Sequence, residues 1–219
     1  MPGFDLQAAL IKAFQETLLM SGISLFVAVA AGGFLGLLLY ATNSPLFIKN
    51  QAVNQVAGVV VNVVRSVPFL VLLVLLIPLS KLVVNTTIGP AAVVVPLSIA
   101  AIAFFARLAD GSFSDVDQGV IEAAISTGAS KWSVVFHILL PEALPSLVRN
   151  ITVTAVSLIG FSAMAGTVGG GGVGDLAIRY GYQRYQVDVM LICVALLIVL
   201  VQGIQLVGDS IAKLLDKKR

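Results

Sequence analysis

Five long apolar segments dominate this 219-residue chain. Each holds about 20 residues, the length that an α-helix needs to cross the hydrocarbon core of a bilayer. Only 11% of the residues are charged, whereas soluble domains average about 25%. Backbone polar groups inside a bilayer must bond within the protein, so the segments predict an all-α membrane protein with five transmembrane helices. The predicted spans run approximately over residues 17–40, 56–79, 89–105, 147–167 and 189–207.

The distribution of lysine and arginine predicts the orientation of these spans. An odd number of spans puts the two termini on opposite sides of the membrane, and cytoplasmic loops carry the excess of basic residues. That excess favours an outside N-terminus and a cytoplasmic C-terminus. Arg65 and Lys81 flank only about 15 uncharged residues, so one or both are expected to snorkel to an interface. The side predicted to be cytoplasmic holds Lys49, Arg65, Arg107, Lys131, Arg149, Lys213, Lys217, Lys218 and Arg219, and the outer side holds Lys12, Lys81, Arg179 and Arg184.

Several functional classes are excluded by residues that the chain lacks. A net charge of +2 argues against nucleic-acid binding, which needs a strongly basic face. A single cysteine, Cys193, excludes an intrachain disulfide and a multi-cysteine metal site. The N-terminus lacks a signal-peptide pattern, so the first span is expected to be retained. With no phosphate-binding loop, zinc motif or catalytic arrangement, no catalytic residue, metal or cofactor is expected.

The glycine run from residue 169 to 174 contains a G-x-G-x-x-G match. A dinucleotide site is rejected, because no strand precedes the glycines and the topology puts them outside. A tight turn with close packing is expected instead. Another glycine pair, Gly32 and Gly36, permits close helix approach. Packing within the chain is favoured over dimerisation as its use.

A polar loop, residues 108–145, separates the third and fourth spans. Apolar or small residues recur there at steps of three and four, which predicts one helical face. Gly128 weakens the middle of that face, so two short helices hinged near it are expected. Ser126, Thr127 and Ser130 suit the start of the second helix, while Pro141 and Pro145 are expected to end it. The stripe alone also fits an amphipathic helix on the membrane surface. It consists of Ile121, Ile125, Gly128, Trp132, Val135 and Leu139.

Fixed residues within this loop carry a more specific signal. Glu122-Ala123-Ala124 is followed after three residues by Gly128, and after nine more by Ile138-x-Leu140-Pro141. This spacing resembles the signature loop of ABC importer permeases. The resemblance implies that a helix over residues 129–136 docks in a groove on an ATP-binding subunit, with Glu122 anchoring the hinge. The implied coupling residues are Glu122, Ala123, Ala124, Gly128, Ala129, Ser130, Lys131, Trp132, Ile138, Leu140 and Pro141.

Two further stretches extend the resemblance over nearly the whole chain. Arg65-Ser66-x-Pro68-Phe69 is similar to a motif of amino-acid importer permeases, and residues 162–182 look like the methionine-uptake branch. The resemblance implies a type I ABC importer permease, one domain over residues 1–219, in the bacterial inner membrane. It also implies import of L- and D-methionine by alternating access. The implied assembly is a homodimer with two ATPase subunits and an external methionine-binding lipoprotein. A permease for another small polar solute, and a channel or secondary carrier without an ATPase, are the alternatives.

A candidate gate lies deep in the fourth span. Ser162 and Met164 stand there among small residues, in the sequence Ser-Ala-Met-Ala-Gly. In a symmetric dimer, two flexible methionine side chains would close an axial pore. Ordinary core packing is the alternative, and the residues alone favour it. The resemblance makes the two interpretations equally strong.

Overall fold

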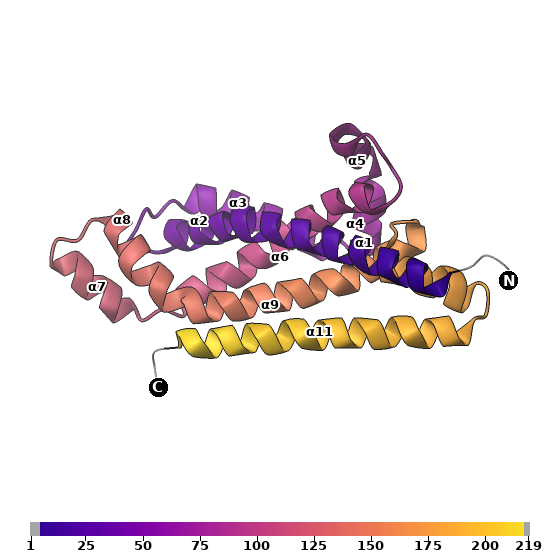
Figure 1. Cartoon of the computed structure of the whole chain (residues 1–219). Coiled ribbons are helices and arrows are strands. Elements are labelled where there is room, and N and C mark those ends of the chain that lie inside the picture. Colours follow the sequence, from indigo (N-terminus) through magenta and orange to yellow (C-terminus); the bar gives the residue numbers. More distant parts are fainter. Residues whose placement is uncertain (1–4, 217–219) are drawn as a thin grey trace.

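A computed structural model describes residues 5–216 of the chain (Figure 1). Every regular element in that range is a helix, which confirms the predicted all-α class. The longest helices lie side by side along one axis, whereas α5 projects from the bundle (Figure 1). The helices are α1 Leu6–Val27, α2 Gly33–Asn43, α3 Gln51–Ser66, α4 Phe69–Leu75, α5 Ile77–Val84, α6 Pro90–Ser114, α7 Gln118–Ser126, α8 Lys131–Val134, α9 Leu140–Ala165, α10 Gly172–Leu176 and α11 Val187–Leu215.

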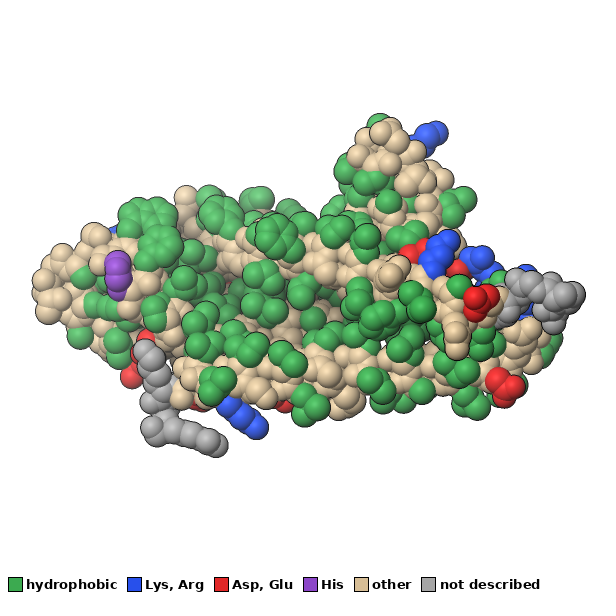
Figure 2. Space-filling model, viewed as in Figure 1, with side chains coloured by type: hydrophobic (Ala, Val, Ile, Leu, Met, Phe, Trp, Pro, Cys, Tyr) green, Lys and Arg blue, Asp and Glu red, His purple; other side chains and the backbone are tan. Residues whose placement is uncertain are grey.

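Four continuous helices of the described chain are long and apolar enough to cross a membrane. A fifth crossing is possible if the bent pair α3 and α4 counts as one span. Hydrophobic side chains cover the long sides of the molecule, and charged ones gather toward its ends (Figure 2). This distribution suits a bundle surrounded by lipid. The four continuous helices are Leu6–Asn43, Pro90–Ser114, Lys131–Val168 and Val187–Leu215.

The prediction that residues 56–79 form one continuous transmembrane helix is wrong. α3 ends at Ser66, and α4 begins at Phe69 after a bend of 103°. Val67 and Pro68 between them have extended backbone angles. Proline disfavours the helical conformation in the residue before it and donates no backbone hydrogen bond. The apolar run is therefore divided at Pro68 despite its length.

The prediction that Pro141 and Pro145 end a helix is also wrong. One continuous helix leads from α8 into α9, with Pro141 in the first turn of α9 and Pro145 inside it. A π-helical turn, Val135–Leu139, comes just before the first proline, and Leu140 N–H bonds Val135 O across it. Such a wider turn is one of the ways in which a helix accommodates a local irregularity. The candidate coupling helix is thus continuous with a candidate membrane span, Lys131–Val168.

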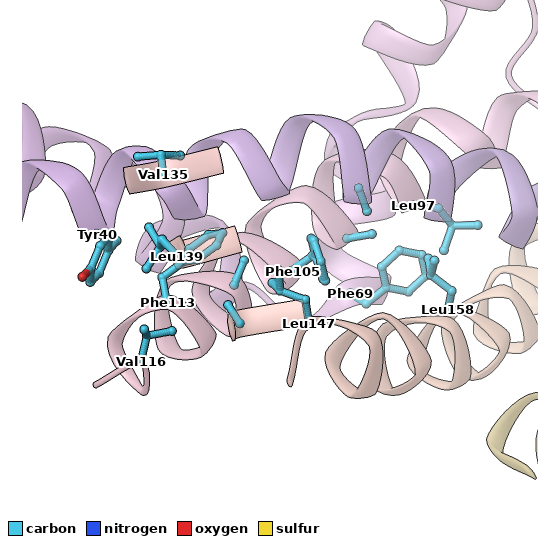
Figure 3. Close-up of a cluster of buried hydrophobic side chains, with 14 of the residues drawn as sticks. Tyr40, Phe69, Leu97, Phe105, Phe113, Val116, Val135, Leu139, Leu147 and Leu158 are labelled. Carbon is cyan, nitrogen blue, oxygen red and sulfur yellow. The ribbon is translucent and has the colours of Figure 1, made fainter. Parts of the chain in front are cut away.

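The main hydrophobic core lies along α6 (Figure 3). Leu97 and Phe105 of α6 are completely or almost completely buried, and Leu158 of α9 lies in the same cluster. Gly36 packs against α6, because a Cβ there would lie 2.7 Å from the carbonyl oxygen of Ala106. Gly32 and Gly36 therefore allow close packing of helices within the chain, which the sequence analysis favoured over dimerisation.

The glycine-rich segment after α9 folds into a tight turn. Gly169, Gly171 and Gly172 have positive φ angles that disfavour other residues. Gly172 N–H donates to Glu16 Oε2 of α1 at 2.8 Å. The neighbouring N–H of Val173 donates to a threonine hydroxyl of α1 at 2.9 Å. The expected turn with close packing is therefore present, and it fastens α10 to the first helix.

Candidate functional site

The polar loop forms a helical hairpin at one end of the bundle, where α7 and α8 lie beyond the long helices (Figure 1). α7 begins after Asp117, whose Oδ1 accepts a hydrogen bond of 2.8 Å from Gly119 N–H. Aspartate is a preferred residue at this capping position. Ile121 is fully buried in the main core and holds the hairpin against the bundle.

The hinge between the two helices has the hydrogen bonds of a Schellman motif. Gly128 N–H donates to Ile125 O at 3.0 Å, and Ala129 N–H donates to Ala124 O at 3.2 Å. Gly128 has a φ of 88°, in the left-handed region. Glycine is the usual residue at this position because it lacks a Cβ. The predicted hinge at Gly128 is therefore present, and Ala124 and Ala129 provide the backbone groups that close it.

Ser130 caps the helix that follows the hinge. Its hydroxyl accepts a hydrogen bond of 3.2 Å from Ser133 N–H, as expected of a capping serine. The hydroxyls of Ser126 and Thr127 instead bond backward, to carbonyl oxygens of α7. These two residues thus stabilise the end of the first helix, and the prediction that they start the second is wrong.

The two charged residues of the motif behave differently. Lys131 Nζ donates to Phe47 O, in the loop between α2 and α3. This bond ties the hairpin to another loop at the same end of the bundle. Glu122 is exposed, and residues 5–216 supply no hydrogen bond or ion pair to its carboxylate. Within residues 5–216, the Glu122 carboxylate therefore anchors the hinge to no other side chain or backbone group. Its role as an anchor toward a partner subunit stays a prediction.

The predicted helical stripe divides into a buried part and an exposed part. Val135 and Leu139 are buried in the main core, whereas the side chain of Trp132 is 70% exposed. Trp132 lies in the first turn of α8, beyond the helices that cover the later residues. Phe136, one turn on, is 56% exposed and stacks on it with ring centroids 6.1 Å apart. Two stacked aromatic rings exposed at one end of the bundle form an apolar patch typical of an interaction site.

Phe136 did not enter the sequence-based site, although its spacing of four from Trp132 would have indicated it. Among the predicted residues, Ala123, Leu140 and Pro141 are exposed, while Ile138 is half-buried. His137 Nδ1 lies 3.1 Å from Ser133 O within its own helix. No group of three or more potential metal ligands occurs among residues 5–216.

The structure separates the two residues of the candidate gate. Ser162 is only 2% exposed, and its hydroxyl donates to Ile159 O at 2.8 Å. Met164 is 50% exposed near the end of α9. Core packing of Met164 within this chain, which the residues alone favoured, is therefore wrong. The side chain of Ser162 is buried inside the helix bundle of its own chain and does not line a pore in this conformation.

Several known proteins are similar in sequence to most of this chain. Residues 29–219 match the family of binding-protein-dependent transport system inner membrane components. The probable D-methionine transport system permease protein MetI of Vibrio cholerae serotype O1 is 47% identical over 209 residues, covering 95% of this chain and 93% of that protein. The methionine import system permease protein MetP of Bacillus subtilis is 44% identical over 181 residues, covering 83% and 82%.

Solved structures share the fold as well. A chain of the MetNI methionine ABC transporter in an inward-facing conformation matches with a TM-score of 0.94 and 39% identity, covering 96% of this chain and 98% of that one. An amino acid ABC transporter crystallised with histidines matches with a TM-score of 0.78 at 21% identity, covering 94% of each, which shows the fold alone. With a family model over residues 29–219 and near-full-length relatives, the chain belongs to the family of binding-protein-dependent transport system inner membrane components.

Proposed function

We propose that this chain is the membrane-spanning permease of an ABC importer that carries methionine into the cell. The observation that carries the proposal is the signature hinge at Gly128 beside an exposed aromatic pair, Trp132 and Phe136. Relatives covering nearly the whole chain are named as methionine permeases, and the solved relative is a methionine ABC transporter. The chain itself has no nucleotide-binding motif, so ATP hydrolysis belongs to a separate subunit.

The coupling step follows from the continuity of the hairpin with a span. The aromatic pair Trp132 and Phe136 docks on the ATPase subunit, and Glu122 and Ala123 approach it from α7. From Lys131 to Ala165 the chain is helical throughout, a length of roughly 50 Å at 1.5 Å per residue. Closure of the ATPases on ATP therefore moves the cytoplasmic end of this helix, and the helix carries the movement toward Met164.

The assembly is a homodimer with two ATPases and an external methionine-binding lipoprotein. The 50% exposure of Met164, near the end of a helix that packs against α1, α6 and α11, supports a second copy across a central path. Two copies of Met164 then form the gate. α1 begins and α11 ends at opposite ends of the bundle (Figure 1), and the basic residues favour a cytoplasmic α11 end in the inner membrane. Residues 217–219, which add to that count, lie outside the described residues.

Reconstitution tests this function directly. The permease is assembled in liposomes with its ATPase and its binding protein, and uptake of radiolabelled methionine is measured with and without ATP. We expect uptake that requires both ATP and the binding protein. Uptake without ATP would identify a channel or secondary carrier instead. Preferred uptake of another amino acid would refute methionine as the solute.

Thiol labelling of intact and permeabilised cells tests the orientation. The native Cys193 is fully buried, so background labelling is low. Tyr180→Cys should react with an impermeant reagent from outside, and Ser130→Cys only after permeabilisation. Reaction of Ser130→Cys in intact cells contradicts the coupling proposal, because the ATPase acts in the cytoplasm.

A further inference from the structure

α3 carries a polar stripe although it forms the first part of a bent transmembrane pair. Steps of seven and four residues place Gln55, Asn62 and Ser66 on one side of the helix, with Arg65 at the edge of that side. All four polar residues are exposed, and so is Val59, which lies between Gln55 and Asn62 on the same side. The opposite side packs inward, where Val61 is buried against α2 and α6. The polar side of α3 is therefore turned away from the core of its own chain.

Arg65 lies at the α3–α4 bend, level with the middle and later turns of α6. It lines a cavity of about 330 Å³ together with Ala100 and Phe104 of α6. These are the eleventh and fifteenth residues of a 25-residue span that begins at Pro90. The expectation that Arg65, Lys81 or both snorkel to an interface stays a prediction. An arginine at this depth is costly unless it faces water or a counter-charge, and such residues commonly mark a solute path.

Neither this chain nor a second copy offers Arg65 a carboxylate at that depth. The sequence has no aspartate or glutamate from residue 17 to 109, from 143 to 174 or from 189 to 208. Asp110 comes nearest in depth, yet it lies about 9 Å farther along α6 than Phe104 and pairs with Arg107 at 3.1 Å. A dimer axis along the membrane normal keeps every residue at its own depth. The second copy therefore brings no acidic partner to this level either.

The walls of the cavity are apolar and aromatic. Phe69 of α4 stacks on Phe161 of α9, with ring centroids 4.8 Å apart and planes at 17°. Both line the cavity beside Arg65. A volume of about 330 Å³ falls in the range of small-molecule sites, about 300–1,000 Å³. One cation among apolar walls suits a small solute with a carboxylate and an apolar side chain.

We propose that the cavity at the α3–α4 bend is a transient site for the transported solute, in which Arg65 binds its carboxylate. The polar residues Gln55 and Asn62 line the aqueous path between this site and the cytoplasm. The inference rests on the proposed function and adds a binding site along the transport path, together with the group of the solute that it binds, a free carboxylate. Guanidinium and carboxylate are both charged, so their hydrogen bonds are stronger where the aromatic walls partly exclude water.

Thiol chemistry on the assembled complex without ATP tests the site. Asn62→Cys should react several-fold faster with a negatively charged thiosulfonate than with a positively charged one, because Arg65 lies less than one turn away. Arg65→Gln should lower that ratio at least fivefold. Val56→Cys, an exposed position on the apolar side of α3, serves as the control and should react with neither. An unreactive Asn62→Cys, or a ratio unchanged by Arg65→Gln, would overturn the inference.

Protection identifies the ligand. Methionine should slow the reaction of Asn62→Cys at least twofold, and methioninamide, which lacks the carboxylate, should not. If both compounds protect equally, or if neither protects, the assignment of Arg65 as the ligand of the solute carboxylate is overturned. Protection by a different amino acid in place of methionine leaves the Arg65 site standing and refutes methionine as the solute. The two proposals therefore fail by different results.

Uptake supplies an independent measurement. We expect Arg65→Gln to reduce ATP-dependent uptake at least tenfold and Arg65→Lys to keep more than a third of it, because lysine retains the charge. Lys81→Gln removes an exposed cation of α5 outside the cavity and should transport normally. Equal losses in the Gln and Lys variants contradict a charge-based role. Near-normal uptake by Arg65→Gln contradicts the site itself.

Discussion

Replacement of Gly128 should uncouple ATP hydrolysis from transport in a graded way. The residue holds a φ of 88°, and no heavy atom lies within 4 Å of the position that a Cβ would take. Gly128→Ala therefore introduces backbone strain without a clash inside the chain. A left-handed conformation costs a residue other than glycine about 1–2 kcal/mol. Since 1.4 kcal/mol corresponds to about tenfold in an equilibrium constant, the native hinge should be disfavoured roughly five- to thirtyfold.

Asparagine separates strain from bulk, because it tolerates the left-handed region better than alanine does. If strain is the cause, Gly128→Asn should transport faster than Gly128→Ala. Tryptophan adds a large side chain that points into open space in this chain and toward the groove of the docked ATPase. Gly128→Trp should therefore have the lowest uptake of the three.

The assay is the initial rate of ATP-dependent methionine uptake in liposomes, divided by the rate of ATP hydrolysis. Gly111→Ala is the matched control, because Gly111 is a helical glycine with open space around it and no positive φ. It should behave as the unmodified protein does. Equal uptake by the Asn and Ala variants refutes the strain argument, and normal uptake by the Trp variant refutes close docking at the hinge.

Three further predictions follow from burial and capping. Met164→Ala should make liposomes leak small solutes without ATP, and the variant protein should melt near the native temperature because the Met164 side chain is 50% exposed. The control Met20→Ala, at a fully buried position, should lower the free energy of unfolding by about 2–5 kcal/mol. A Met164→Ala variant that stays impermeable and is strongly destabilised contradicts the gate. Ser130→Ala should lose the cap of α8, about 1 kcal/mol, and lower uptake several-fold, while Ser130→Asp restores it. Gly36→Val should reduce the yield of folded permease, measured by size-exclusion chromatography in detergent, because a Cβ there meets α6 backbone at 2.7 Å.

The sequence alone determined the all-α membrane class and the hinged hairpin. Apolar runs of span length have few solutions in a bilayer, so four of the five predicted spans correspond to continuous helices. The hinge at Gly128 and the cap at Ser130 are local features that depend on the backbone preferences of single residues. Such signals need no tertiary information, which is why the structure confirms both.

Tertiary structure decided where the helices bend and which side chains face outward. Pro68 and Pro141 are both prolines near apolar runs, yet one divides a span and the other lies within a continuous helix. Packing and a neighbouring π-helical turn determine that difference, and neither is a property of the proline itself.

Burial shows the same limit of local information. Met20 and Met164 are the same residue type in apolar helices, but one is fully buried and the other half exposed. The cavity that Arg65 shares with Ala100 and Phe104 of α6 likewise emerged only from the tertiary structure. Sequence periodicity shows which residues share a helix face, whereas the neighbouring helices decide whether that face meets the core, lipid or a solute path.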